Sequence, residues 1–488
     1  MKFKRTLALL LAALMLAATA CGTESEGGSD TTAETEAVTT AAETEAETIP
    51  YMDTLPVENY DGYSFVMLAQ SYDQRPNLPF YEEEVGEPLN DALIRRNRLV
   101  EARYNITIEN VADQNRDNVT NMVKKAVRSD EETYSMVINS TSIGMNTLTT
   151  GGSLYDLSQI GYLNLQEDWW CKNIYDDFQI DGHLFFTSGA LSPFYYYTPI
   201  AFAYNKTVTD SYGITGLEEK VLDGSWTFDY MMSLAKDKSY DMNGDSALDE
   251  NDFWAVISPG DQVHGAGLDM LKRTSDGFAF NIDEAFVAKL SKIAEFAATD
   301  DGFIDFTSSD LPLTMFQNNQ AMFMYTAMNN VITGYNAVPS WREMESDYGI
   351  LPLPKYDENQ EEYWTLGNAP GPNGIGVPIN CSDPQRTGLI METLAYYSYE
   401  LVKPAAYDSI VKEKGTRTEM AGEMLDILYS GVRFYVYDVF NFGKSKDLIG
   451  KAINDPDFNF ISSFEALRSK AEKDLEKYVE DLRSFNAN

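Results

Sequence analysis

The feature that most constrains the fold is an alternation of β-rich and helical segments between residues 63 and 139. Short runs of apolar and β-branched residues are separated by stretches in which apolar residues recur every three or four positions. The predicted order is strand, helix, strand, helix, strand, over residues 63–68, 90–104, 106–108, 118–127 and 134–139. This order favours parallel strands joined by right-handed helical crossovers. The sequence therefore predicts an α/β fold with mostly parallel sheets flanked by helices.

Two polar loops follow the first and third predicted strands. In open α/β sheets, ligands meet the loops at the carboxyl ends of the strands. Gln70 lies in the first loop, residues 69–72, and Ser140 and Thr141 lie in the second, residues 139–142. Their amide and hydroxyl groups can donate and accept hydrogen bonds, whereas neither loop contains a base, a nucleophile or a metal-binding cluster. We expect binding residues here rather than catalytic ones, with ordinary polar loops as the alternative.

The first fifty residues predict the location of the protein. Lys2, Lys4 and Arg5 precede an apolar run that ends in small residues directly before Cys21. This is the pattern of a secretory signal, and the run is shorter than the roughly 20 residues that a spanning helix needs. The junction resembles a bacterial lipobox, which implies a signal peptide over residues 1–20 and lipidation of Cys21. A plain secretion signal is the alternative.

Residues 21–50 are predicted to form a flexible tether. They are rich in Ser, Thr, Ala and Glu, contain no base and show no apolar periodicity, so we expect them to be disordered. A lipid at one end would hold the folded part at the extracellular face of the cell membrane.

The composition excludes several classes of function. The formal charge of −39 argues against a nucleic-acid partner, because a phosphate backbone would be repelled. Two His residues cannot form a three-His metal site, and they disfavour a His-centred catalytic site. Three Cys residues rule out a disulfide-built scaffold. Besides Cys21 these are Cys171 and Cys381, and the sequence leaves open whether the two pair or stay free.

Residues 241–252 have the spacing of a calcium-binding loop. Oxygen-bearing side chains occupy positions 1, 3, 5, 9 and 12, and position 7 would supply its backbone carbonyl. The predicted ligands are Asp241, Asn243, Asp245, Ala247, Asp249 and Asp252. Ser246 replaces the usual Gly at position 6, and position 12 carries Asp instead of Glu. The motif predicts a structural Ca²⁺, with an acidic turn that holds no ion as the alternative.

Seven short motifs then follow one another along the chain. They are 90–106, 154–158 with Trp169-Trp170, 197–206, 225–228, 319–322, 348–355 and 374–378. In this order they resemble the extracellular solute-binding proteins of bacterial ABC importers, family 1, the carbohydrate type. The resemblance implies a two-lobed, type II periplasmic-binding-protein-like fold with a hinge between the lobes. The first lobe would comprise residues 51–190 and 353–402, and the second lobe residues 193–350 and 403–488.

The resemblance also implies where a solute would bind. Sugar rings present apolar faces that stack on aromatic side chains and hydroxyl groups that bind polar ones. The densest aromatic cluster, residues 194–197, falls at the first crossover between the lobes. The predicted ligand-binding residues are Gln70, Ser140, Thr141, Phe194, Tyr195, Gln262, Tyr325, Trp364, Arg433 and Tyr435. The alternative for the aromatic members is packing in the core.

The leading hypothesis is a non-enzymatic transport receptor that binds a saccharide and delivers it to an ABC permease. We expect it to be a monomer. A secreted glycan-cleaving enzyme is one alternative, for which a pair of carboxylates about 5–10 Å apart in the cleft would be needed. A ligand sensor that signals without transport is another, and the sequence does not separate it from a transporter.

Overall fold

The computed structural model describes residues 50–71, 83–303, 310–333, 341, 344–367, 370–411, 420–455 and 457–485. The predicted signal peptide, Cys21 and residues 21–49 of the tether lie outside the described residues. None of the described helices is both long and apolar enough to span a bilayer.

The first sheet has the strand order β12-β3-β1-β2. Its strands are β1 (Tyr63–Gln70), β2 (Ile106–Asp113), β3 (Met136–Asn139) and β12 (Gly374–Gly376). β1 pairs in parallel with both β2 and β3, whereas β12 returns antiparallel to β3. The strands and helices predicted between residues 63 and 139 are all present, so the predicted α/β order is confirmed.

Local sequence signals explain the helices around this sheet. The helices of this first lobe are α2 (Tyr51–Thr54), α3 (Pro88–Tyr104), α4 (Arg116–Ser129), α5 (Asn146–Thr150), α6 (Lys172–Phe178), α14 (Pro384–Tyr397) and α15 (Lys403–Val411). The side chain of Asn115 caps α4 by accepting a 2.8 Å bond from Asp117 N, and α3 ends where Asn105 adopts a left-handed conformation with φ of 50°. The Asn115 cap thus starts α4 soon after β2, and the turn at Asn105 lets β2 begin directly after α3.

A buried carboxylate connects several segments of the first lobe through hydrogen bonds. Glu392 on α14 is fully buried and accepts hydrogen bonds from Trp169 Nε1 and Trp170 Nε1, both at 2.9 Å. Tyr51 donates a third bond at 2.6 Å and the Asn164 amide a fourth at 3.2 Å. These bonds tie the segment that leads into α6 to the helix that covers the sheet.

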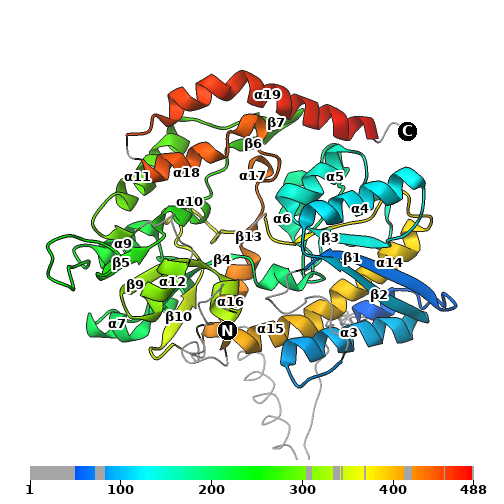
Figure 1. The fold of residues 1–488 in the computed structure, drawn as a ribbon, viewed down its shortest axis with the longest axis horizontal. Helices are drawn as coiled ribbons and strands as arrows, with labels where there is room; N and C mark the ends of the chain where they lie inside the picture. Colours follow the sequence, from blue (N-terminus) through cyan, green and yellow to red (C-terminus); the bar gives the residue numbers. More distant parts are fainter. Residues whose placement is uncertain are drawn as a thin grey trace, which may run out of the picture. The chain divides into compact units, whose positions relative to one another are not determined.

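The second sheet has the order β10-β4-β9-β5-β8. Its strands are β4 (Ile200–Asn205), β5 (Trp254–Ile257), β8 (Gly302–Phe303), β9 (Ala321–Ala327) and β10 (Tyr348–Leu351). β5 runs parallel to β8 and β9, while β4 is antiparallel to its neighbours β9 and β10. Figure 1 shows the two sheets on opposite sides of the folded part, with β13 between them.

The remaining elements surround the second sheet or bridge the lobes. The helices are α7 (Lys206–Ser211), α8 (Leu217–Leu222), α9 (Phe228–Ala235), α10 (Gln262–Gly265), α11 (Glu284–Ala297), α12 (Asp310–Gln317), α13 (Met328–Thr333), α16 (Ala421–Ser430), α17 (Val436–Phe440), α18 (Asp447–Asn454) and α19 (Phe460–Phe485). Two small sheets pair β6 (Leu271–Thr274) with β7 (Gly277–Phe280), and β11 (Thr365–Leu366) with β13 (Val432–Arg433). Helix α19 extends over α18 and β7 toward α5 of the first lobe (Figure 1).

The return crossing between the lobes lies later in the chain than the sequence indicates. The sequence motifs predict that residues 353–402 belong to the first lobe. Lys355 O instead accepts a 2.7 Å bond from Phe228 N, and Pro354 O accepts a 2.9 Å bond from Gln262 Nε2. Residues 353–366 therefore pack on the second lobe, and the crossing falls between β11 and β12. The second predicted boundary, at residue 403, also lies later, because α15 (Lys403–Val411) packs on α3 of the first lobe.

Candidate functional site

One cavity of about 380 Å³ lies at the carboxyl end of β5. We call it the strand-end cavity; it is lined by residues of 258–264, by Tyr437 and Asp438 of α17, and by residues of 446–454 on and before α18. Ser258 turns the chain sharply after β5, with φ of 58° in the left-handed region. Gly260 allows α18 to approach, because a Cβ at this position would lie 2.6 Å from Ile453 Cγ2. The position matches the rule that ligands of α/β sheets bind at strand carboxyl ends.

The strand-end cavity contains polar side chains that lack partners. Among the described residues, no hydrogen bond or ion pair reaches the Asp261 carboxylate, and burial raises its pKa to about 6. His264 Nδ1 is buried without a hydrogen-bond partner, and burial lowers the pKa of this imidazole to about 4. At neutral pH the cavity therefore offers a carboxylate and a neutral imidazole to a ligand.

The remaining charge in this cavity is arranged along its rim. Asp438 and Lys446 form an ion pair at 3.3 Å, Asp447 is a further carboxylate of the lining, and Val263, Ile449 and Ile453 contribute apolar side chains. A ligand with both hydrogen-bonding groups and apolar faces is the chemical type that such a lining fits.

The residues that line this cavity all come from the second lobe, and the first lobe packs against α17, which forms part of its wall. The turn η1 (Thr141–Met145) follows β3 directly, and it lies against α17. Asn146 Nδ2 donates a 3.1 Å hydrogen bond to Val439 O across the two lobes. The carboxyl ends of β3 and β5 thus meet near the same helix.

Six of the predicted binding residues lie close to these strand ends, but their side chains are buried. Tyr325 donates a 2.7 Å bond to Gln262 Oε1 behind the cavity. The Tyr435 ring lies 6.2 Å from that of His264, and its hydroxyl donates a 3.4 Å bond to His264 O. Gln70, Ser140 and Thr141 end the first-lobe strands, where the Ser140 hydroxyl accepts a 3.2 Å bond from Ile143 N. In this conformation these six residues support the strand-end cavity rather than line it.

The other four predicted residues lie elsewhere. Phe194 is buried at the crossover, where its carbonyl accepts a 2.9 Å bond from Thr198 Oγ1. Tyr195 and Arg433 line a second cavity of about 520 Å³, and the guanidinium of Arg433 lies 4.3 Å above the ring of Trp364. Of the ten predicted residues, Tyr195 and Arg433 therefore line the second cavity, and none lines the strand-end cavity.

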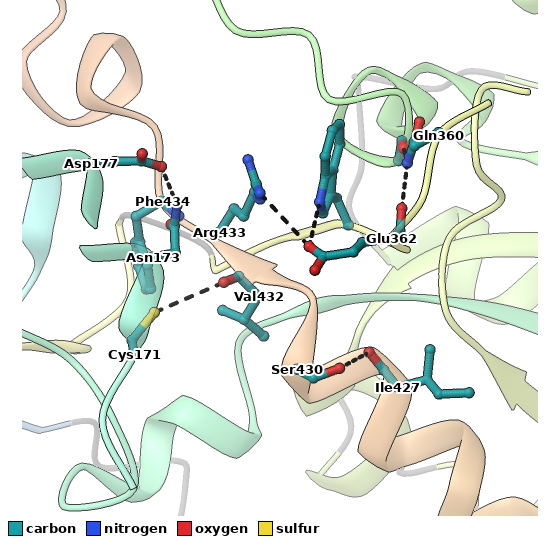
Figure 2. A network of polar contacts seen from close by, with 12 residues as sticks. Cys171, Asn173, Asp177, Gln360, Glu362, Ile427, Ser430, Val432, Arg433 and Phe434 are labelled. Atoms are coloured by element: carbon teal, nitrogen blue, oxygen red, sulfur yellow. Dashed lines mark hydrogen bonds and ion pairs between the residues drawn. The ribbon is translucent and has the colours of Figure 1, made fainter. Parts of the chain in front are cut away.

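We call this second space the hinge cavity. First-lobe residues of 168–177, 399, 403 and 407 line it, together with the crossover residues 195 and 196 and second-lobe residues 362, 426, 429, 430, 432 and 433. Figure 2 shows how β13 lies against the start of α6 beside it: Phe434 N donates to Asn173 Oδ1 at 2.6 Å, and Cys171 Sγ donates to Val432 O at 3.9 Å. It does not lie at the carboxyl end of a strand of either main sheet.

The sequence analysis missed Asp261, His264, Tyr437 and Asp438. The first two flank Gln262 after β5, so the strand-end rule that selected Gln262 would also have selected them. Tyr437 and Asp438 carried no comparable signal, because only the packing of α17 against α10 and α18 brings them to the cavity.

The predicted calcium loop has the expected sharp turn, and its carboxylates accept hydrogen bonds from backbone N–H groups of the same loop. Ser246 at position 6 adopts φ of 71°, which keeps the sharp turn without Gly. Asp252 is fully buried and accepts bonds from Met242 N and Asp249 N, both at 2.8 Å. In the described part of the chain, no three His, Cys, Asp or Glu side chains converge as metal ligands. Binding of Ca²⁺ by this loop stays a prediction.

The two later cysteines are free and buried. Burial raises the pKa of Cys171 to about 12, so its thiol stays protonated beside the hinge cavity. Cys381 lies 3.3 Å from the Thr387 hydroxyl.

Comparison with known proteins identifies the fold. No protein-family model matches the chain, and no curated protein does. Among solved structures, the chain is similar to a cyclo/maltodextrin-binding protein complexed with maltotetraose, at 12% identity and a TM-score of 0.54, over 86% of this chain and 96% of that one. It is also similar to the galacto-N-biose-/lacto-N-biose I-binding protein of the ABC transporter from Bifidobacterium longum, at 13% identity and a TM-score of 0.51, over 87% and 98%.

The fold is that of the two-lobed solute-binding proteins. The fold class predicted from the motifs is thereby confirmed. At this level of identity the likeness extends to the architecture, and the chemistry of the site has to be argued from this chain's own residues.

Proposed function

We propose that this protein is the solute receptor of an ABC importer and that it captures a saccharide without altering it. The observation that carries the proposal is the strand-end cavity, which combines an unpartnered carboxylate and imidazole with apolar walls. Sugar hydroxyls would donate to Asp261 and exchange hydrogen bonds with His264, while a ring face would pack on Val263 and Ile449. The similar solved structures, whose names include maltotetraose and lacto-N-biose, support the same ligand class.

The two-lobed fold gives this binding a physical consequence. Residues after β5 and residues after β3 come from different lobes, and both lie next to α17. A solute that contacts both would favour the closed arrangement by its difference in affinity for the two states. Recognition of the closed form by a permease would then couple capture to import.

We also propose that Cys21 is lipidated and that the acidic tether holds the receptor at the extracellular face of the membrane. The support is the sequence pattern around Cys21, which lies outside the described residues. Mass spectrometry of the protein purified from membranes tests this, since a mature chain beginning at residue 21 with an acylated Cys is expected.

A panel of saccharides tests the main proposal. Isothermal titration with neutral mono- to tetrasaccharides should reveal at least one ligand, and Asp261→Asn should weaken its affinity about tenfold, as expected for the loss of a charge-assisted hydrogen bond. Glu109→Gln, an exposed carboxylate on β2 distant from both cavities, is the matched control. Product analysis after long incubation should show the sugar unchanged. Absence of binding across the panel, or hydrolysis of the bound glycan, would refute the proposal.

A further inference from the structure

The hinge cavity has a different chemistry from the strand-end cavity. Its lining contains five carboxylates and three cations, and every cation is already paired with a carboxylate of the same lining. Lys172 lies 2.6 Å from Asp168, Lys403 lies 3.0 Å from Asp426, and Arg433 lies 3.9 Å from Glu362. Figure 2 shows the last of these pairs. Two carboxylates of the lining, those of Asp176 and Asp177, form no ion pair among the described residues; the nearby Arg273 guanidinium donates instead to the carbonyl oxygens of Asp176 and Gln179, at 2.7 and 2.9 Å.

The surplus carboxylates both belong to α6. Asp177 is partly buried and accepts a hydrogen bond from Asn173. Burial raises its pKa, and the more distant charges of Arg433 and Arg273 oppose this effect. A negative charge that is partly withdrawn from water and not paired favours a cation next to it.

Aromatic rings form much of the remaining wall. Tyr195, Tyr196, Tyr407 and Tyr429 pack on one another, with the rings of Tyr407 and Tyr429 stacked at 5.4 Å and those of Tyr196 and Tyr429 edge to face at 5.4 Å. Aromatic faces carry partial negative charge and attract ammonium groups that lie within about 6 Å of the ring centre. The lining therefore offers both kinds of group that recognise an organic cation.

One corner of the cavity already holds an ammonium group in this way. Lys403 Nζ lies 4.7 Å from the centre of the Tyr399 ring and 5.1 Å from that of Tyr407. Tyr407 in turn donates a 3.1 Å bond to the carboxylate of Asp426, which pairs with Lys403. This corner shows, within the chain itself, the combination of rings and carboxylate that an external cation would need.

We propose that the hinge cavity is a second ligand site, which binds a compact organic cation such as a quaternary or primary ammonium compound. The volume of about 520 Å³ admits a small molecule. A divalent metal fits less well, because no three metal-ligating side chains converge among the described residues. An anionic ligand would meet the surplus negative charge.

The position of the cavity connects it to lobe movement. Its walls come from α6 of the first lobe and from α16 and β13 of the second, and the crossover residues Tyr195 and Tyr196 lie between them. A bound cation would contact both lobes, so its affinity depends on how the lobes are arranged. By thermodynamic linkage, the cation and a solute in the strand-end cavity would then change each other's affinity by the same factor.

Titration of the full-length protein with choline and its neutral isostere 3,3-dimethylbutan-1-ol tests the proposal. Isothermal titration at low salt should show choline binding and at least a tenfold weaker signal for the isostere. Asp177→Asn and Asp176→Asn should each weaken choline binding, with a loss of about tenfold for the more buried Asp177. Glu109→Gln should bind choline like the wild type.

Three outcomes would overturn the inference. Equal binding of choline and the isostere would remove the role of charge, and unchanged affinity in both Asp variants would remove the assigned site. Loss of choline binding in Asp261→Asn, with retention in Asp177→Asn, would place the cation in the strand-end cavity instead. Because sugar titration reads the strand-end cavity separately, failure here leaves the proposed saccharide function intact.

Discussion

Replacing Glu392 should destabilise the protein strongly, although the residue carries a charge in an apolar interior. The carboxylate on α14 accepts three side-chain bonds, from Tyr51, Trp169 and Trp170, and one backbone bond from Asn164 N. Burial raises the pKa of Glu392, and these donors act in the opposite direction by stabilising the ionised form. The carboxylate is therefore tolerated because its hydrogen bonds compensate the loss of hydration.

The magnitude follows from the donors that a substitution leaves behind. Glu392→Leu would strand two buried indole N–H groups, at about 1–3 kcal/mol each, and the less buried Tyr51 hydroxyl at about 1 kcal/mol. We expect a loss of about 3–7 kcal/mol in the free energy of unfolding. Glu392→Gln keeps one acceptor oxygen, so we expect a loss of about 1–2 kcal/mol.

Urea unfolding followed by far-UV circular dichroism measures these differences without relying on the fluorescence of Trp169 and Trp170. The Leu variant should also bind choline less well, because Trp170 and Cys171 lead into α6 at the hinge cavity. A Leu variant within about 1 kcal/mol of the wild type would refute the reasoning. So would a Gln variant as unstable as the Leu variant, since the two differ in retained acceptors.

Four further predictions concern the second lobe. Burial lowers the pKa of His264 to about 4 from its ordinary 6.5, so between these pH values the unfolded chain binds a proton that the folded chain does not, and the free energy of unfolding falls as the pH falls. His264→Gln removes this loss. Between pH 7 and pH 4.5 the variant's free energy of unfolding, measured with urea, should therefore rise by about 1–2 kcal/mol relative to that of the wild type. Burial raises the pKa of the Asp261 carboxyl to about 6, so protonation of this group stabilises the folded wild type as the pH falls from 6 to 4. Asp261→Asn lacks this gain, and its free energy of unfolding should fall relative to that of the wild type over the same range. Gly260→Ala should cost about 1–3 kcal/mol and weaken sugar binding, because the new Cβ would lie 2.6 Å from Ile453 Cγ2; unchanged melting and affinity would contradict this. If the loop 241–252 takes up Ca²⁺ by rearranging, excess chelator should lower the melting temperature, and Asp241→Asn should abolish the shift; no shift would remove the calcium prediction.

The sequence alone determined the architecture. Local signals such as the Asn115 cap and the apolar runs of β1 and β3 depend on neighbours within a few residues, so they can be recognised without the fold. The order of the motifs then predicted two α/β lobes, and the likeness to solved structures confirmed them. The strand-end rule also selected Gln262, which is a sequence neighbour of the cavity residues Asp261 and Val263.

Only the tertiary structure decided which side chains face a cavity. Gln262 and Tyr325 have the right chemistry, yet they satisfy each other in the interior, while Tyr437 reaches the cavity because α17 packs beside α10. Likewise, Trp169 and Trp170 meet Glu392 across more than 220 residues, a pairing that no local pattern encodes. The physical reason is that exposure and hydrogen-bond partners depend on contacts between distant segments, whereas helices and strands depend mainly on residues that are close in sequence.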